Sequence, residues 1–388
     1  MRSVSVIGIG ETTMGRYPDR SLQDMIAQAG NAAIADAGIE KSKLEAIYFS
    51  NFNAQQLCGQ GHMGAMVNEV LGLTLPTIRV EAACASGSLA FREAYVAVAA
   101  GIYDVVLVGG VEKMTHRATE DVTEAIASAS DVSAEANLGV TFPGIFAMIA
   151  NRYFHEYGNA RDAMTAVAIQ NHANASHNPD AQMPKPVTKE KVEEGFKIAD
   201  PFTVFDCSLV TDGAAFTVIC ATDIAKTLTK GKVIELIGSG HGGNTISIAS
   251  KESITTFDAT VDAATKAYKM AGLTPEDIDL AEVHDCFTIT QIINGEDLGF
   301  FKKGEGAQAV LDGKTAINSG VVAINPSGGL KAKGHPIGAT GLSQIFEVVT
   351  QLRGEAGGRQ VPNAKIGLTH NIGGTAGTCV VNIFREVE

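Results

Sequence analysis

The feature that most constrains the fold of this chain is an internal repeat. Residues 37–49 read Ala-Gly-Ile, then a leucine, then an apolar strand-like run, and residues 271–283 repeat this order at a constant offset of 234. Further along, both Cys84 and His335 precede a helical stretch, an apolar strand and a Gly-Gly pair. Such self-similarity indicates two related halves. It places the loops of Cys84 and His335 at equivalent positions, and a pseudo-twofold arrangement would bring them face to face.

The pattern within each half predicts an α/β fold. Short Val- and Ile-rich runs, such as residues 4–9, alternate with longer Ala-rich helical stretches, which is typical of parallel strands covered by helices. Residues 111–230 carry several prolines and a charged run, as inserted loop regions do. We expect the first part of an N-terminal half in residues 1–110, an inserted loop region plus the end of that half in 111–230, and a C-terminal half in 231–388.

Composition argues against several functions. The formal net charge of −13 leaves no general positive field for a polyanion, so we expect no nucleic-acid binding. Six cysteines without a C-x-x-C pair suggest neither a zinc knuckle nor a disulfide framework, and they fit a reducing cytoplasm. The most apolar stretch, residues 139–154, is 16 residues long and falls short of the roughly 20 that span a bilayer. The N-terminus lacks a signal-peptide core, so we expect a cytoplasmic protein without a membrane anchor.

Cys84 is the first candidate for chemistry. It follows a strand-like run, precedes an Ala-rich helix and has only small neighbours, so an acyl group has room beside its sulfur. Free amides and the helix dipole at such a position are expected to stabilise a thiolate and to lower the cysteine pKa from about 8.5. The competing interpretation is an inert packing cysteine, which is favoured for Cys58, Cys220 and Cys379.

Two histidine segments are the other candidates. His335 lies in a glycine-rich loop that suits an imidazole held near a thiol and a carbonyl oxygen, and a simple turn histidine is the alternative. His284, Asp285 and Cys286 end a predicted strand, where α/β sheets display functional groups. A metal site is the competing idea there, but adjacent side chains of an extended strand cannot all face one ion, so we expect no metal.

Seven short motifs together are highly specific. They are Cys84-Ala85-Ser86, Gly109-Gly110-Val111-Glu112-Lys113-Met114, Asp212-Gly213-Ala214-Ala215, His284-Asp285-Cys286-Phe287, Asn325-Pro326-Ser327-Gly328-Gly329, Gly334-His335-Pro336 and Gly373-Gly374. With them the chain resembles a thiolase over essentially its full length. It is most similar to the sterol-carrier-protein type and to archaeal acetoacetyl-CoA thiolases, because other thiolases carry Asn-Glu-Ala-Phe in place of His-Asp-Cys-Phe.

The resemblance implies a fold and a set of roles. Thiolases have two duplicated βαβαβαββ halves in a five-layer αβαβα arrangement, with a loop domain inserted in the first half. By resemblance, Cys84 takes the acyl group, and His335 activates that thiol and helps to hold a thioester oxygen. His284 stands where the usual asparagine positions a water at the same oxyanion hole. The amides of Cys84 and Gly373 form the other hole.

One position departs from the family pattern. Most thiolases carry an acid/base cysteine two residues before the glycine of the final turn, and this chain has Asn371 there, preceded by His370. Cys286 is the natural substitute, because the sterol-carrier-protein type uses the cysteine of its His-Asp-Cys-Phe motif in that role. His370 is the fallback.

The resemblance also indicates the substrate and its contacts. It implies an acetyl-CoA C-acetyltransferase that condenses two acetyl-CoA into acetoacetyl-CoA through an acyl-cysteine, with coenzyme A as substrate or product and no cofactor. Ser208 matches the serine that contacts pantetheine, and Cys207 and Val210 are its neighbours. Lys331 is placed to meet a phosphate of coenzyme A, and an exposed lysine without a partner is the plainer interpretation.

Other functions and partners follow from the same family. The alternatives are a 3-ketoacyl-CoA thiolase of broader chain length, a hydroxymethylglutaryl-CoA synthase or ketoacyl synthase, and a non-catalytic acyl-CoA-binding subunit. Cys286 and the thiolase-like glycine loops weigh against the synthases. Family analogy predicts a homodimer or tetramer. It also suggests that acetoacetyl-CoA passes to a hydroxymethylglutaryl-CoA synthase through a zinc-ribbon/OB-fold adaptor protein.

Overall fold

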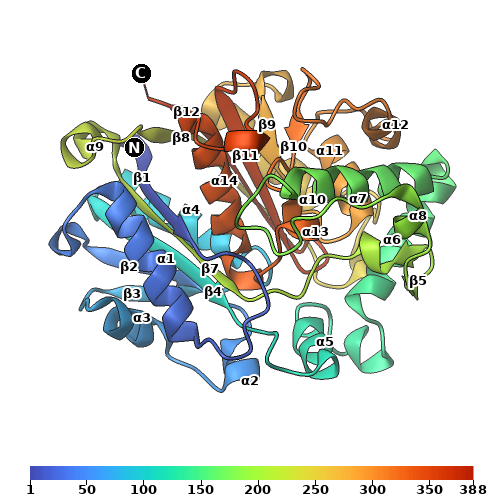
Figure 1. Cartoon of the computed structure of the whole chain (residues 1–388), viewed down its shortest axis with the longest axis horizontal. Helices are drawn as coiled ribbons and strands as arrows, with labels where there is room; N and C mark the ends of the chain where they lie inside the picture. Colours follow the sequence, from blue (N-terminus) through green and yellow to red (C-terminus); the bar gives the residue numbers. More distant parts are fainter. Residues whose placement is uncertain (388) are drawn as a thin grey trace.

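The computed structural model describes residues 1–387, and its centre is a ten-stranded sheet in which the repeat becomes a symmetric strand order (Figure 1). The first half contributes β1 (Val4–Glu11), β2 (Ala46–Ser50), β3 (Thr77–Val80), β4 (Val105–Glu112) and β7 (Gly213–Ala221), and the second contributes β8 (Ile234–Gly243), β9 (Leu280–Glu282), β10 (Ala323–Ile324), β11 (Ile366–Gly373) and β12 (Thr378–Glu386). The spatial order is β10-β9-β11-β12-β8-β1-β7-β4-β2-β3. Outward from the central antiparallel β1·β8 pair, each half therefore shows its own first, fifth, fourth, second and third strand.

Helices complete a layered structure around this sheet. One apolar cluster joins Phe91 of a middle helix and Leu342 of another to strand residues of both halves, such as Val6 and Phe384. Separate clusters lie on the two outer faces. The α/β fold with two duplicated halves, predicted from the sequence, is confirmed. The middle helices are α4 (Ser86–Ala99) and α14 (Thr340–Arg353), the outer ones are α1 (Leu22–Ala37), α3 (Met63–Leu71), α10 (Asp258–Ala271) and α11 (Thr288–Asp297), and short helices are α2 (Ala54–Cys58), α9 (Thr222–Leu228), α12 (Gly306–Leu311) and α13 (Gly329–Ala332).

The segment between β4 and β7 packs over the second half of the chain (Figure 1). Tyr153 donates a hydrogen bond to Glu296 on α11 at 2.5 Å, and Asn171 donates to Asp285 at 2.7 Å. This segment therefore covers the strand ends that carry the candidate groups. Its elements fall within the predicted range 111–230 and are α5 (Thr119–Ala127), α6 (Phe142–Tyr157), α7 (Arg161–Ala175), α8 (Lys189–Glu193), β5 (Lys197–Ala199) and β6 (Phe202–Thr203).

The apolar stretch of residues 139–154 forms most of α6. Thr141 caps this helix by accepting a hydrogen bond from the amide of Gly144, and its apolar face is buried through Ile145, Phe146 and Ile149. Within residues 1–387, no helix combines the length and the apolar character needed to cross a membrane.

The candidate residues follow the carboxyl ends of strands. Cys84 follows β3, His284 and Cys286 follow β9, and His335 follows β10 and the short helix α13. β3 runs parallel to β2, and β10 runs parallel to β9, so their carboxyl ends share one edge within each half. The symmetric order of the halves allows these two edges to meet, as the repeat predicts.

Strand β8 approaches α10 so closely that only glycine fits at some positions. A Cβ atom on Gly240 would lie 1.8 Å from the carbonyl oxygen of Ala263, whereas a Cβ atom on Gly243, at the end of the strand, would meet nothing within 4 Å. We predict that Gly240→Ala lowers the free energy of unfolding by more than the roughly 1–3 kcal/mol typical of overpacking, and that Gly243→Ala changes it little. Chemical denaturation measures both variants, and equal stabilities would contradict this packing.

Candidate active site

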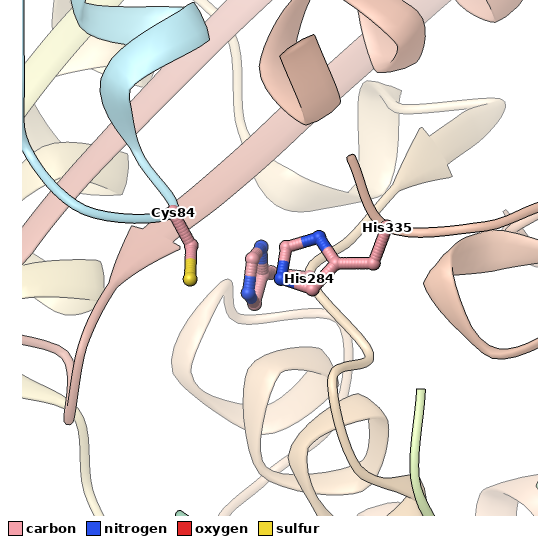
Figure 2. Close-up of side chains that lie close together, drawn as sticks. All are labelled: Cys84, His284 and His335. Carbon is pink, nitrogen blue, oxygen red and sulfur yellow. The ribbon is translucent and has the colours of Figure 1, made fainter. Parts of the chain in front are cut away.

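Three side chains from distant parts of the sequence meet at one point (Figure 2). The sulfur of Cys84 and one ring nitrogen each of His284 and His335 lie within 4.8 Å of one another. The two imidazoles pack edge to face, with ring centroids 5.1 Å apart and planes at 84°. Cys84 belongs to the first half and both histidines to the second, so the cluster exists only where the two halves pack together.

These groups line one cavity of about 180 Å³ with a mostly apolar wall. The second thiol, Cys286, lies in the same wall and is 8% exposed. Of the site residues predicted from sequence, Gly373, Lys331 and the fallback His370 do not line it. The remaining lining residues are Met114, Thr123, Ile126, Phe142, Pro143, Phe146, Cys207, Ser208, Leu209, Val210, Phe287, Ile337 and Gly374.

Burial decides the protonation state of the Cys84 thiol. Desolvation raises its pKa to about 12, although the amides of Gly374 and of Cys84 itself donate to the sulfur and partly oppose this. Helix α4 begins two residues later, at Ser86, and its dipole does not outweigh the loss of water. The expectation of a lowered pKa is therefore wrong. The thiol is protonated in the resting site and needs a base to become a nucleophile.

The hydrogen bonds of His335 identify which ring nitrogen is the base. Its Nδ1 lies 2.8 Å from Thr340 Oγ1, and the Thr340 hydroxyl donates to the carbonyl oxygen of Pro336 at 3.1 Å. Because that hydroxyl proton is committed, Thr340 Oγ1 accepts from the ring, and Nδ1 carries the ring proton. Burial lowers the pKa of His335 to about 3, so the ring is neutral. Its Nε2 is left without a proton, on the side of Cys84 (Figure 2).

Buried polar groups hold the His335 turn in place. The amide of His335 donates to Thr211 Oγ1 at 2.9 Å. Three residues later, the amide of Gly338 donates to the carboxylate of Glu112 at 2.9 Å, and its carbonyl oxygen accepts from Ser50 at 2.6 Å. Glu112 is fully buried, and desolvation raises its pKa to about 7. The end of β4 and the end of β2 thus fix a loop that belongs to the other half.

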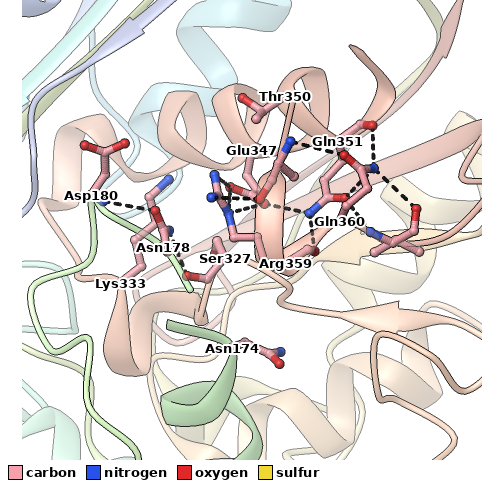
Figure 3. Close-up of polar contacts among 12 residues, drawn as sticks. Asn174, Asn178, Asp180, Ser327, Lys333, Glu347, Thr350, Gln351, Arg359 and Gln360 are labelled. Carbon is pink, nitrogen blue, oxygen red and sulfur yellow. Dashed lines mark hydrogen bonds and ion pairs between the residues drawn. The ribbon is translucent and has the colours of Figure 1, made fainter. Parts of the chain in front are cut away.

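A buried layer of charged and amide side chains lies next to this turn (Figure 3). Lys333, two residues before His335, pairs with Glu11 at 2.9 Å, and its side chain is only 4% exposed. Glu347 on α14 pairs with Arg359 at 3.0 Å. Buried ions of opposite charge satisfy one another, and removing one partner would leave an uncompensated charge. Glu11 also accepts from Ser343 of α14 at 2.8 Å, so the end of β1 holds both the His335 loop and α14.

His284 is fixed through its backbone and its ring. Its amide donates to His370 Nδ1 at 3.3 Å, and its carbonyl oxygen accepts from Asn294 Nδ2 at 2.9 Å. Its ring Nδ1 lies 2.9 Å from Asn371 Nδ2. Burial, together with the neighbouring His335 and His370, lowers the pKa of His284 well below its usual value. The ring is therefore neutral and held in one orientation.

The structure separates the two candidates for the second acid/base. His370 is fully buried, does not line the cavity, and uses Nδ1 for the His284 amide and Nε2 for Thr260 Oγ1 at 3.0 Å. Cys286 does line the cavity, and burial beside Cys84 raises its pKa well above the usual value. This geometry favours Cys286 and gives His370 a structural role.

The glycine turn after β11 contacts the Cys84 sulfur through its second glycine. The amide that donates to the Cys84 sulfur is that of Gly374, not Gly373. Both glycines line a neighbouring cavity, and a Cβ on Gly373 would lie 2.3 Å from the carbonyl oxygen of Ala82. Gly374 has φ +58°, a conformation that favours glycine. The turn therefore directs the second of the paired glycines at the sulfur.

The predicted pantetheine loop is joined to both catalytic segments through the backbone. The amide of Ser208 donates to the carbonyl oxygen of Cys286 at 2.8 Å, and Val210 forms a β-bridge with His335. These contacts place Cys207, Ser208 and Val210 on the cavity wall. The loop is thus part of the site framework.

Lys331 does not occupy the position expected of a phosphate ligand or of an exposed lysine. It is 2% exposed, and its ammonium group donates to the carbonyl oxygen of Cys207 at 2.6 Å. Desolvation lowers its pKa. Its position indicates that it stabilises the loop of Cys207, and the side chain does not line the cavity.

Three residues that act on the reacting groups were not singled out from the sequence. Thr340 orients His335, Asn371 contacts His284, and Gly374 contacts Cys84. Thr340 follows His335 by five residues at the start of α14, and its hydroxyl at a helix start was the one available signal. Asn371 was noted only because the usual cysteine is missing there.

Comparisons with known proteins agree with this geometry. Residues 4–223 match the family described as thiolase, N-terminal domain, and residues 238–386 match the thiolase C-terminal domain-like family. The chain belongs to the thiolase family. It is 51% identical to an acetyl-CoA acetyltransferase of Methanothermobacter thermautotrophicus, over 99% of this chain and 100% of that protein. It is 45% identical to an acetyl-CoA acetyltransferase of Methanocaldococcus jannaschii, over 100% of both chains.

More distant relatives share the fold. Human sterol carrier protein 2 is 32% identical over 99% of this chain and 72% of that protein. The solved structure titled Ltp2-ChsH2(DUF35) aldolase superposes with a TM-score of 0.86 at 24% identity, over 98% of this chain and 97% of that one. A monomeric SCP2-thiolase like protein type 1 from Mycobacterium smegmatis superposes with a TM-score of 0.77 at 18% identity, over 98% and 77% of the two chains.

The role of Thr340 can be tested on the thiol itself. Thr340→Val removes the acceptor for the His335 Nδ1 proton, so the ring is free to protonate Nε2 and lose its function as a base. We predict that alkylation of Cys84 by iodoacetamide slows by about tenfold to a hundredfold, and that Thr340→Ser retains most of the rate. Cys84→Ala supplies the background, and an unchanged rate in Thr340→Val would contradict the assignment of the tautomer.

Proposed function

We propose that this protein is an acetyl-CoA C-acetyltransferase, which condenses two acetyl-CoA molecules into acetoacetyl-CoA and cleaves acetoacetyl-CoA by thiolysis in reverse. The observation that carries this proposal is the convergence of Cys84, an unprotonated Nε2 of His335 and a second thiol, Cys286, on one cavity. Two relatives that match the full chain at 51% and 45% identity bear the name acetyl-CoA acetyltransferase, which supports acetyl-CoA as the substrate.

The first half-reaction transfers an acetyl group to Cys84. His335 Nε2 takes the thiol proton while the sulfur attacks the thioester carbon, and a new C–S bond forms. The amides of Cys84 and Gly373 are the proposed donors to the oxyanion that develops on the thioester oxygen, while the amide of Gly374 donates to the resting sulfur. The bond to coenzyme A then breaks, and the leaving thiolate takes a proton from Cys286. Acetyl-Cys84, free coenzyme A, a His335 imidazolium and a Cys286 thiolate remain.

The second half-reaction forms the carbon–carbon bond. The Cys286 thiolate is a strong base because burial raises its pKa, and it removes an α-proton from a second acetyl-CoA. Donors from His284 and His335 stabilise the enolate oxygen. The enolate carbon attacks acetyl-Cys84, and the departing Cys84 thiolate recovers the proton held by His335. Acetoacetyl-CoA leaves, and both thiols are protonated again, as in the resting site.

Coenzyme A enters this scheme as substrate and product. Val210 on the cavity wall is 40% exposed, which marks the solvent side of the pantetheine loop. Ser208 in the same loop is the proposed pantetheine contact. No step described above needs a further cofactor, because the two thiols and the imidazole of His335 supply every proton transfer.

A 3-ketoacyl-CoA thiolase of broader chain length is the second candidate. It is favoured by the apolar side chains beside the reacting sulfur, where Met114, Ile126, Phe146 and Ile337 line the cavity. Thiolysis rates with 3-ketoacyl-CoA substrates of increasing chain length compare the two candidates. A rate that falls steeply beyond acetoacetyl-CoA supports the acetyltransferase.

The two thiols can be assigned to separate half-reactions. We predict that Cys84→Ala abolishes covalent acetylation by labelled acetyl-CoA. We predict that Cys286→Ala still acetylates but loses condensation by at least the roughly 10²-fold typical of a general acid or base. Intact-protein mass spectrometry detects the acetyl group, and release of coenzyme A reports turnover. Unchanged condensation in Cys286→Ala would remove this residue from the role, and failure of the wild type to acetylate would remove the proposed function.

Partners are proposed from the same family. We expect a homodimer or tetramer, and transfer of acetoacetyl-CoA to a hydroxymethylglutaryl-CoA synthase through a zinc-ribbon/OB-fold adaptor. Such a complex would draw an uphill condensation forward by consuming its product. One structurally similar protein carries DUF35 in its title, which supports a search for an adaptor. We predict that the native protein co-purifies with both partners, and purification without either would contradict the complex.

A further inference from the structure

Asn371 contacts the ring of His284 in a way that leaves few choices for the ring proton. Asn371 Nδ2 lies 2.9 Å from His284 Nδ1, and both residues are buried, with exposed fractions of 0% and 1%. With its nitrogen facing the ring, the Asn371 amide is the donor there, so His284 Nδ1 acts as the acceptor, and Asn371 Oδ1 is buried without a hydrogen-bond partner. A neutral imidazole carries one proton, which must then lie on Nε2.

The surroundings of the ring keep this contact in place. Asn371 lies in β11, where its backbone pairs with Val380 of β12, so only its side chain is available to His284. The carbonyl oxygen of His284 accepts from Asn294 Nδ2 at 2.9 Å and from Thr290 Oγ1 at 3.1 Å. The backbone of His284 is therefore anchored, and the ring cannot exchange its two nitrogens without breaking the contact with Asn371.

The titratable groups that face the ring do not supply a charge that would protonate it. They are His335 and His370, which are both neutral because burial lowers the pKa of each to about 3, together with the thiols Cys84 and Cys286. Both thiols are protonated in the resting site because burial raises the pKa of each. His284 is therefore neutral at rest, and the position of its single ring proton decides whether Nε2 can donate a hydrogen bond.

We propose that Asn371 is a positioning residue that fixes His284 as the Nε2–H tautomer, so that this ring donates a hydrogen bond to the thioester oxygen while His335 keeps an unprotonated Nε2. The inference rests on the proposed function and explains what stands at the place of the usual acid/base cysteine. The two histidines receive opposite tautomers from opposite neighbours, because Thr340 accepts from one ring and Asn371 donates to the other. One ring is a base and the other is a donor, although both are buried and neutral.

The tautomer of His284 can be read directly in the wild-type protein. In protein labelled with ¹⁵N-histidine, long-range proton–nitrogen spectra distinguish a protonated from an unprotonated ring nitrogen, and His284→Gln identifies the signal. We expect His284 to show a protonated Nε2 and an unprotonated Nδ1 across the neutral range. A protonated Nδ1 with an unprotonated Nε2 would overturn the inference. This measurement needs no substrate, so it stands apart from the outcome for the proposed function.

Asn371→Asp provides the functional test, because a carboxylate can only accept from His284. The carboxylate is expected to raise the pKa of His284 and to favour the imidazolium, which still donates through Nε2. When that imidazolium loses a proton, the remaining one stays on Nδ1 at the carboxylate, and Nε2 loses its donor function. Condensation by Asn371→Asp should therefore fall as pH rises through the new pKa, by about 10²-fold to 10³-fold, as for the loss of one oxyanion donor. The wild type should show no such fall from His284.

Two further variants make the test specific. Asn371→Leu has similar size but no donor, and we expect a lower kcat with the KM for acetyl-CoA nearly unchanged and no new dependence on pH. Asn318→Asp places the same charge change at an exposed position that does not line the cavity and should behave as the wild type. If the pH profile of Asn371→Asp superimposes on that of Asn318→Asp, Asn371 does not set the tautomer. If the wild type lacks condensation altogether, the proposed function fails, and the nitrogen spectra alone decide the inference.

Discussion

The desolvation of the reacting groups in a mostly apolar cavity is the constraint on which the rest of the site depends. Burial raises the pKa of Cys84 to about 12 and lowers that of His335 to about 3, so both are uncharged at rest. Cys84 and His335 therefore do not form a thiolate–imidazolium pair at rest. The thiol becomes a nucleophile only when it transfers its proton to His335 as the substrate binds. The hydrogen bonds around the cavity hold these uncharged side chains so that the Nε2 atoms of His284 and His335 are available to the reacting groups.

That placement is achieved by buried carboxylates that accept hydrogen bonds from amide groups of neighbouring segments, in one case from the other half of the fold. Glu112, at the end of β4, accepts from Gly338 in the His335 turn. Asp285, beside His284, accepts from the amide of Leu330 at 2.7 Å and from Asn171. Buried carboxylates are costly unless amides satisfy them, so each fixes the geometry of the loops that satisfy it. The two halves of the duplication are thus joined through polar contacts as well as through the apolar middle layer.

Much of the fold could be predicted from local patterns. The repeat between residues 37–49 and 271–283 predicted β2 and β9 as equivalent strands. Of the two Gly-Gly pairs of the repeat, Gly373-Gly374 stands at the end of β11, whereas Gly109-Gly110 lies within β4. The convergence of Cys84 with His335 followed from the same equivalence. The lowered pKa expected for Cys84 was wrong because the helix dipole is a local property, whereas desolvation depends on which distant segments cover the sulfur. The exposed state considered for Lys331 was wrong for the same reason.

The sequence by itself determined the α/β architecture, the duplication and the chemical identity of the reacting groups, because periodicity, turn residues and thiol or imidazole side chains are properties of short segments. Only the tertiary structure decided which of these groups share a cavity, which amide of the Gly373-Gly374 turn meets the sulfur, and which nitrogen of each ring is free. Protonation states and hydrogen-bond directions depend on neighbours that are hundreds of residues away in the chain. Those neighbours come together only when the halves pack.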